Sequence, residues 1–143
     1  MLDVIIELIS VLLLILSIIL LLSRLEMSTL SIRSILDKLV LTGPNFLDWI
    51  RNLRLVLHQE KIEYVLDKPI PEVPTDAEAL SSFNRDSHAK HEEDALNAQC
   101  IMIASMSMEL QRQHEHLMPY EMLIHLKGLF ENVTKSAEYD ILR

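Results

Sequence analysis

The chain is short of the residues on which several common protein classes depend. Among 143 residues it has one cysteine, Cys100, and two glycines, Gly43 and Gly128. One cysteine excludes an internal disulfide and a zinc site built mainly on cysteines. Two glycines, together with few alternating β-branched runs, argue against an all-β or doubly wound fold. They also leave no glycine-rich loop that could cradle a phosphate.

Basic charge is scarce as well. Thirteen Lys and Arg residues stand against 21 Asp and Glu, so the formal net charge is −8. An acidic chain repels phosphate on average, and binding of RNA or DNA would need a local basic cluster. The basic residues are scattered, and Arg51, Arg54 and Lys61 come nearest to a cluster. We therefore expect that nucleic acid is not a partner of this fragment.

Residues 4–22 (VIIELISVLLLILSIILLL) differ from everything that follows them. A helix of this length, rising about 1.5 Å per residue, just spans a hydrocarbon core of roughly 30 Å. The run is apolar on every side, so it is not one face of an amphipathic helix. Asp3 precedes it, whereas Arg24 and Lys38 follow it, which places the C-terminal body in the cytoplasm. We predict a single transmembrane helix within residues 1–26.

Two other interpretations of residues 1–26 stay open. A cleaved signal peptide fits less well, because no basic region precedes the run and residues 23–26 (SRLE) offer no small-x-small cleavage site. Alternatively, the segment is an upstream extension outside the working protein, because Met27 followed by Ser28 and Thr29 would suit the start of a soluble domain. The body would then be cytoplasmic without a membrane anchor.

Residues 41–49 (LTGPNFLDW) combine a turn, a helix start and an aromatic-led apolar face. Gly43 permits positive φ and Pro44 fixes φ near −65°, so together they predict a sharp turn. We expect the side chain of Asn45 to cap a helix by accepting a hydrogen bond from a free backbone N–H. Trp49 is interpreted as a core anchor, and an exposed aromatic at a self-assembly interface is the alternative. Apolar residues then recur at helical spacing: Phe46, Trp49, Ile50, Leu53, Val56 and Leu57.

Before the prolines, the spacing of apolar residues predicts three helical stretches. A short amphipathic helix covers residues 29–40 and leads into the turn. The helix that begins at Asn45 runs to about His58 or Glu60. A further helical turn or two over residues 61–66 directs three apolar side chains inward: Ile62, Val65 and Leu66.

Three prolines within six positions interrupt this pattern: Pro69, Pro71 and Pro74. Each fixes φ and disfavours helical backbone in the residue before it. Residues 69–75 are therefore predicted to be an extended connector. It divides the chain after the hydrophobic helix into two helical parts, residues 27–68 and residues 76–143.

The second part begins with a helix that Thr75 or Asp76 can cap and whose character persists through about Met108. Ser107 is then expected to cap a short helix that ends at Gln113. The buried stripe before it is predicted to comprise Ala95, Leu96, Gln99, Cys100, Ile103, Met106 and Leu110.

Pro119 ends that region, and residues 120–132 form a clear amphipathic helix. Thr134 is expected to cap a last helix. The predicted inward face of residues 120–132 comprises Met122, Leu123, Leu126, Leu129 and Phe130. With no strand and no internal repeat predicted, the fold class is all-α: a transmembrane-like helix followed by a bundle of about five or six helices.

Histidine clusters are the strongest candidates for chemistry in the sequence. His88 and His91 lie three residues apart on one predicted helix, a spacing that can share a ligand. His114, Glu115 and His116 form a second cluster. Neither matches the His-Glu-x-x-His pattern that places two ligands and a base on one helix face. We predict neither a metal site nor a cofactor.

The remaining reactive residues favour a structural interpretation. Cys100 is predicted to be buried, where it would behave as a small hydrophobe rather than as a nucleophile. The serines have no histidine placed by a recognisable motif. Five methionines are interpreted as core filler, with an adaptable partner groove as the alternative: Met102, Met106, Met108, Met118 and Met122. The residues therefore predict that the chain is not an enzyme.

Several strings of residues are specific enough to suggest a family. They are residues 36–54 (LDKLVLTGPNFLDWIRNLR), 60–71 (EKIEYVLDKPIP), 95–102 (ALNAQCIM), 108–115 (MELQRQHE) and the helix at 120–130. Together they resemble the start of the gag polyprotein of copia-type plant LTR retrotransposons, over about residues 28–143. The signature positions are Gly43, Pro44, Asn45, Phe46, Trp49 and Leu53, and none of them belongs to a catalytic motif.

The resemblance implies an all-α, capsid-like domain that self-assembles into particles around element RNA. The family continues into more helices and a Cys-x2-Cys-x4-His-x4-Cys zinc knuckle that grips RNA, whereas this chain has one cysteine and ends earlier. The family also does not need the hydrophobic N-terminus. The resemblance thus implies a gag-derived structural fragment that self-associates without catalysis. The alternative function is a single-pass membrane-anchored protein whose cytoplasmic body binds partners.

Overall fold

The computed structural model describes residues 1–141, apart from the side chains of residues 27–31 and 133–141. Within this part of the chain there is no strand, only an isolated bridge between Leu41 and Met106. The predicted all-α class, with a long apolar helix followed by six shorter ones, is confirmed. The elements are α1 (Leu2–Lys38), α2 (Phe46–Gln59), the 3-10 helix η1 (Glu63–Leu66), α3 (Ala77–Ser82), α4 (Arg85–Ala104), α5 (Met108–His114) and α6 (Pro119–Ile141).

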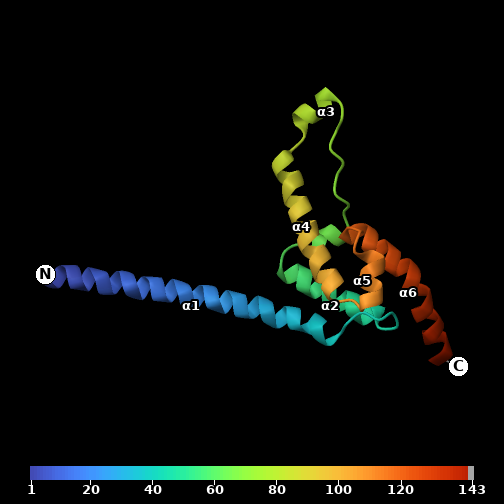
Figure 1. Ribbon diagram of the computed structural model, residues 1–143, viewed down its shortest axis with the longest axis horizontal. Coiled ribbons are helices and arrows are strands. Elements are labelled where there is room, and N and C mark those ends of the chain that lie inside the picture. The colour runs from blue at the N-terminus through green and yellow to red at the C-terminus, as the bar shows by residue number, and fades with distance from the viewer. Residues whose placement is uncertain (142–143) are drawn as a thin grey trace.

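α1 is one uninterrupted helix that projects from the rest of the chain as a rod (Figure 1). The separate helix predicted over residues 29–40 is therefore the last part of α1. No glycine or proline occurs between Met1 and Gly43, so nothing in the backbone ends the helix earlier. The predicted limit after residue 26 falls within α1, and the division into domains stays a prediction.

The helices after α1 form a body around one core. α2 lies at its centre and buries Phe46, Trp49, Leu53, Val56 and Leu57, as its apolar spacing predicts. The last turns of α1 pack on α2, and η1 packs against α2, α4 and α6. α6 also contacts α2 and α4, so α2 is covered from several sides.

The end of α2 and the turn after it match the predictions. α2 ends at Gln59, between the two predicted end points, and Ile62 and Val65 are buried. The N–H of Lys61 donates to the carbonyl of His58 at 3.0 Å, and that of Ile62 donates to the carbonyl of Leu57 at 2.9 Å. This pair of bonds is a Schellman motif, with Lys61 at φ 63° in the position that glycine usually takes.

The connector leads to α3, which lies at the tip of an arm that stands out from the body (Figure 1). Asp76, rather than Thr75, caps α3 by accepting a bond from Ala79 N at 2.7 Å. The prediction of one helix through Met108 is wrong, because the chain breaks at Phe83. Asn84 then caps α4 by accepting a bond from Ser87 N at 3.0 Å. Its side chain competes with helical backbone and starts a new helix.

The buried stripe of α4 differs from the predicted one. Leu96 is 52 % exposed and Cys100 is exposed, so the prediction that they are buried is wrong. The helix buries Ala95, as predicted, and also Ala98 and Met102. The small alanine side chains let α4 approach η1 and α6 closely, whereas a leucine one position along points about 100° away. The error is confined to Leu96 and Cys100, because the other predicted positions are buried or half-buried: Ala95, Met106, Leu110, Gln99 and Ile103.

The last two helices confirm some predictions and correct others. Ser107 caps α5 by accepting a bond from Leu110 N, as predicted. α6 begins at Pro119. Proline suits this position because N–H groups in the first turn have no hydrogen-bond partner within the helix, so the N–H that proline lacks is not needed. The helix continues through Thr134, so the prediction of a separate last helix is wrong; the Thr134 side chain lies outside the described residues. Met122, Leu123 and Leu126 are buried as predicted, whereas Leu129 is 40 % exposed, so its predicted inward position is wrong.

Candidate functional site

The stretch 41–49 lies against the junction between α4 and α5, which is far away in sequence. The N–H of Leu41 donates to the carbonyl of Ser105 at 2.8 Å, and the N–H of Ser107 donates to the carbonyl of Leu41 at 2.9 Å. Trp49 is fully buried, and its Nε1–H donates to Ser105 Oγ at 3.0 Å. Trp49 is therefore the predicted core anchor, with its one polar atom satisfied inside the protein.

Two features make glycine necessary at position 43: its backbone conformation and the nearby ring of Phe130. Its φ is 129°, a conformation that residues with a Cβ rarely adopt, and an added Cβ would lie 3.0 Å from Cε1 of Phe130. The Phe130 ring lies 6.0 Å from that of Phe46, which in turn lies 6.2 Å from the ring of Trp49. These contacts join the start of α2 to α6.

Asn45 does not make the predicted cap. Its Oδ1 accepts bonds from the N–H of Thr42 at 3.0 Å and from the Thr42 hydroxyl at 3.3 Å. Its Nδ2 donates to the carbonyl of Val40 at 2.7 Å. The side chain thus turns back to the preceding loop instead of forward to the N–H groups of α2. The predicted cap is wrong, because a tight turn brought backbone partners closer than the helix did.

Five of the six positions that carry the resemblance make structural contacts in this protein. Gly43, Phe46, Trp49 and Leu53 are buried, Asn45 holds the turn, and Pro44 is exposed. They extend from the turn before α2 to the middle of that helix, and none of them lines the cavities of about 690, 560 and 270 Å³. Polar side chains elsewhere in the body form the candidate site.

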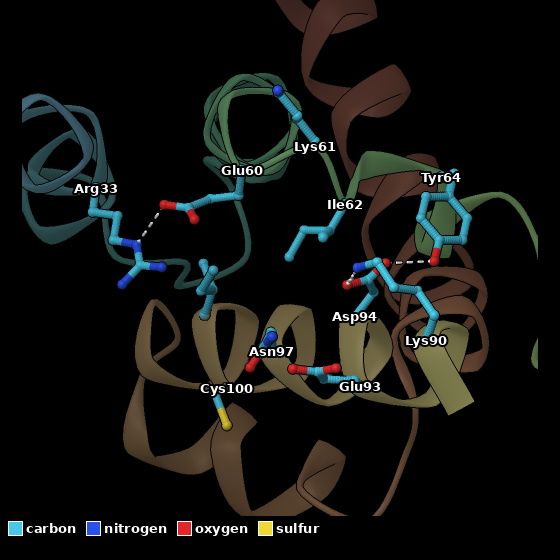
Figure 2. A pocket seen from close by; sticks show the side chains of 11 residues that line it. Arg33, Glu60, Lys61, Ile62, Tyr64, Lys90, Glu93, Asp94, Asn97 and Cys100 are labelled. Carbon is cyan, nitrogen blue, oxygen red and sulfur yellow. Dashed lines mark hydrogen bonds and ion pairs between the residues drawn. The ribbon is translucent and has the colours of Figure 1, made fainter. Parts of the chain in front are cut away.

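A cavity of about 690 Å³ opens between the end of α1, the end of α2, η1 and α4. Figure 2 shows two polar groups on its sides. On one side, Nε of Arg33 donates to Oε1 of Glu60 at 3.1 Å. On the other side, Tyr64, Asp94 and Lys90 are joined by hydrogen bonds. We take this cavity as the candidate site.

Asp94 is the central charge of the cavity and is only 4 % exposed. Its Oδ1 accepts a bond from Nζ of Lys90 at 2.7 Å, and its Oδ2 accepts one from the hydroxyl of Tyr64 at 2.6 Å. Burial raises the pKa of Asp94, but the bonds from Lys90 and Tyr64 outweigh the burial and leave the pKa below its usual value.

Tyr64 is kept in its neutral form by burial and by its hydrogen bond to Asp94. Burial, and then the bond to the Asp94 carboxylate, raise the pKa of Tyr64 to about 12. At neutral pH the group is therefore a charged Asp94 with two donors, and both carboxylate oxygens are occupied. This arrangement fixes η1 to α4; it does not present a free base beside a nucleophile, which acid–base catalysis would require.

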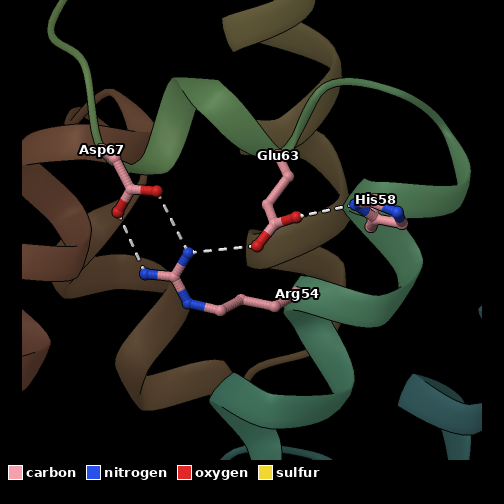
Figure 3. A network of polar contacts seen from close by, with 4 residues as sticks. All are labelled: Arg54, His58, Glu63 and Asp67. Carbon is pink, nitrogen blue, oxygen red and sulfur yellow. Dashed lines mark hydrogen bonds and ion pairs between the residues drawn. The ribbon is translucent and has the colours of Figure 1, made fainter.

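A second polar network fastens η1 to α2 (Figure 3). Arg54 Nη2 donates to Asp67 Oδ1 at 3.1 Å, and Nη1 donates to Asp67 Oδ2 at 3.2 Å and to Glu63 Oε1 at 3.3 Å. The bonds between them raise the pKa of Arg54 and lower that of Asp67. His58 Nδ1 lies 3.0 Å from Glu63 Oε2. Arg54, part of the nearest approach to a basic cluster, is thus already bound by two carboxylates.

The histidines of the first predicted cluster, His88 and His91, each contact a backbone carbonyl instead of a shared ligand. His88 Nε2 lies 2.9 Å from the carbonyl oxygen of Pro71, and His91 Nε2 lies 3.2 Å from that of Lys68. These bonds tie the connector to α4. In the part of the chain that the structure describes, no group of three or more His, Cys, Asp or Glu residues could hold a metal ion.

His114 makes a contact that its neighbours in sequence do not predict. The residue is fully buried; its Nδ1 lies 2.7 Å from the carbonyl oxygen of Leu110, so Nδ1–H donates there. Its Nε2 lies 2.8 Å from Nδ1 of His125 on α6. Burial lowers the pKa of His114, and the nearby His125 and His116 lower it further.

The polar pairs of the candidate site were not among the candidates that the sequence suggested: Arg33 with Glu60, and Asp94 with Lys90 and Tyr64. The spacing of Lys90 and Asp94, four apart on a helix, was a signal that could have identified their ion pair. No local signal connects Tyr64 to Asp94, because the two side chains meet only when η1 packs on α4.

No family model, curated protein or solved structure matches the chain. The resemblance to gag polyproteins therefore stays an expectation from the strings of residues that suggest it. Three features of the structure bear on function: an exposed apolar helix, a body whose polar clusters are hydrogen-bonded, and an arm.

Proposed function

We propose that the chain is a single-pass membrane protein whose helical body lies in the cytoplasm and binds protein partners. One observation carries the proposal. All of residues 1–26 are exposed, and Leu2–Glu26 is long and apolar enough to cross a membrane. The body does not cover any part of this span.

The exposed apolar surface of the span is more stable in lipid than in water. Full burial of a large aliphatic side chain contributes about 1.5–3 kcal/mol, so the span as a whole represents tens of kcal/mol. Net stabilities of folded proteins are only about 5–15 kcal/mol. Exposure of such a surface to water would drive aggregation, whereas a bilayer covers it on all sides. The backbone of a helix is satisfied internally, as a bilayer requires.

The charges at the two ends of the span support the orientation. Asp3 and Glu7 lie at the N-terminal end, and Arg24 lies at the C-terminal end. Lys38 follows in the last turn of α1. Basic residues near a span favour the cytoplasmic side, so the body is proposed to be cytoplasmic.

A binding role suits the body better than a reaction. The polar groups of the candidate cavity are engaged with one another: Arg33 with Glu60, and Asp94 with Lys90 and Tyr64. Cys100 also lines the cavity, but no histidine lines it that could activate the thiol. The proposal is therefore a membrane-held module for protein contacts.

Carbonate extraction tests the anchor. The full chain and a variant that begins at Met27 are expressed in cells, and membranes are washed at alkaline pH. We expect the full chain in the pellet and the shorter variant in the supernatant. Release of the full chain would refute the proposal. Intact mass identifies cleavage of residues 1–26, and protease accessibility of a C-terminal tag in sealed vesicles checks the orientation.

A second candidate function is capsid-like self-assembly of the body. It is favoured by the gag resemblance and by exposed apolar side chains on the outer side of α2: Leu47 is 42 % exposed and Leu55 is 55 % exposed. Sedimentation velocity of the full chain in detergent micelles tests it. Assembly predicts oligomers that grow with concentration and weaken in Leu55→Lys. A body that stays monomeric at high concentration would contradict it.

A further inference from the structure

Residues 68–74 (KPIPEVP), called the proline segment below, have a backbone that their own sequence restricts. They are neither helix nor strand, and they run outward beside α4 toward α3 (Figure 1). Proline fixes φ near −65° at three of the positions, and Lys68, Ile70 and Val73 each precede a proline. A residue before proline is biased to extended or polyproline II backbone. The segment is thus predisposed to polyproline II, with little conformational entropy left to lose on binding.

The side chains of the proline segment follow the three-residue repeat of polyproline II. Lys68, Pro71 and Pro74 fall on one edge of such a helix. Ile70 and Val73 fall on the next edge, so each forms an apolar–proline pair with the residue after it. A flanking cation followed by two apolar–proline pairs, three residues apart, fits the groove of an SH3-type domain. Such grooves hold PxxP ligands in aromatic-lined slots.

Much of this surface is open to a partner. Lys68, Pro71 and Glu72 are exposed, and Val73 is 53 % exposed although it is apolar. Ile70 is half-buried and packs against the core of the body. The second apolar–proline pair is therefore accessible as the protein stands, and the first becomes accessible when the segment moves away from α4.

We propose that residues 68–74 are a docking ligand for an SH3-type domain with an acidic pocket that receives Lys68. The inference deepens the proposed function, on which it rests, by naming the class of partner that the cytoplasmic body binds. The cation selects SH3-type domains among the polyproline II readers, because opposite charge at the end of the groove sets affinity and orientation.

Two histidines oppose this docking. The bonds from His88 to the Pro71 carbonyl and from His91 to the Lys68 carbonyl hold the segment against α4. A partner that needs the whole segment must displace them. Two hydrogen bonds of ordinary strength correspond to roughly a tenfold change in affinity. Loss of both histidine side chains therefore strengthens docking.

The test measures binding of the full chain in detergent micelles to purified, immobilised SH3 domains with acidic specificity pockets. Pro71→Ala/Pro74→Ala is expected to weaken binding about tenfold or more, because both slots lose their proline. Pro69→Ala is the matched control: this proline lies on the third edge, so affinity changes less than about twofold. Lys68→Glu weakens binding about tenfold, and most strongly at low salt. His88→Ala/His91→Ala strengthens it about tenfold.

Three results would overturn the proposal. The first is no binding by either the wild type or His88→Ala/His91→Ala. The second is an equal loss in Pro69→Ala and Pro71→Ala/Pro74→Ala. The third is binding to WW domains, used as the negative arm, but not to SH3 domains. Circular dichroism confirms that each variant is folded. Because the chain is held in micelles, failure of membrane insertion in cells leaves this result unaffected, so the two proposals fail separately.

Discussion

The first two helices are both rich in leucine and isoleucine, yet the body leaves the apolar side chains of the first exposed and buries those of the second. The span Leu2–Glu26 of α1 is exposed on every side, whereas α2 buries five residues on one face and exposes Asp48 and Arg51 on the other. The distribution of apolar residues around the axis decides this outcome. A one-sided helix is covered by a few neighbours, but a helix that is apolar all round needs cover on all sides.

The comparison implies that the two regions respond to different changes. Substitutions in the span should alter where the protein resides without altering the stability of the body. Substitutions in the body should lower its stability without releasing the protein from membranes. Four predictions test this separation, from the largest expected effect to the smallest.

Charges at the centre of the span should have the largest effect. Each lysine at the middle of a membrane helix costs about 2.5–3.5 kcal/mol, so Leu12→Lys with Leu16→Lys costs about 5–7 kcal/mol. We expect a smaller fraction of this variant than of the wild type in the carbonate pellet, with unchanged hydrogen exchange in the body. Leu12→Val with Leu16→Val serves as the control and should match the wild type. An unchanged pellet fraction of the lysine variant would contradict insertion of the span.

Removal of the core anchor should unfold the body without releasing the chain. Trp49→Ala deletes a fully buried ring and leaves Ser105 Oγ without its donor. We expect a loss of about 3–5 kcal/mol in the free energy of unfolding, measured by hydrogen exchange of body amides in nanodiscs. Leu47→Ala, on the exposed side of the same helix, should change it by less than about 0.5 kcal/mol. Equal effects would contradict the burial.

The two glycines should respond to the same substitution with opposite signs. Gly43→Ala should destabilise the body by about 1–3 kcal/mol, because φ is 129° and Phe130 blocks the new methyl group. Gly128→Ala should stabilise it by about 0.5–1 kcal/mol, because Gly128 lies within α6 and nothing lies within 4 Å of the added Cβ. Thermal unfolding of each variant measures the difference. A stabilising Gly43→Ala would refute the description of the turn.

Acid should weaken the body through His114. Burial lowers the pKa of His114 in the folded protein, so the unfolded chain binds the proton more readily. The stability from neutral His114 is thus complete above about pH 6.5, the unfolded value, and is lost as the pH falls through the folded pKa. We expect the free energy of unfolding to fall between pH 7 and pH 5, and a flatter profile in His114→Gln. Ionised Asp94 stabilises the fold at neutral pH, and this stability is lost only at more acidic pH than that from His114, because the folded pKa of Asp94 lies below its usual value.

Local sequence patterns predicted most helix positions. They failed where the outcome depended on residues that meet only in the folded protein. The apolar face of α2, the Asp76 and Ser107 caps and the extended connector follow from residues within one turn of each other. The Asn45 side chain had two sets of backbone partners within reach, and only the folded turn selected the Val40 and Thr42 groups. In α4, burial went to Ala98 because close packing there requires a small side chain.

The candidate cavity could not be predicted in the same way. The Lys90–Asp94 pair has helical spacing, but Tyr64 and Arg33 come from elements that are distant in sequence. Their positions depend on how η1 and α1 pack against the rest of the body. The same holds for the contact between His114 and His125, which lie on different helices.

Features that depend on one segment follow from the amino-acid sequence alone: an apolar span of membrane length, the one-sided face of α2, and the polyproline II bias of residues 68–74. Steric limits on the backbone and the period of apolar residues decide such features before any helix meets another. Tertiary structure alone decided the partners of Asp94, Arg54 and His114. Hydrogen bonds and ion pairs act over only a few ångströms, and packing between helices decides which side chains come that close.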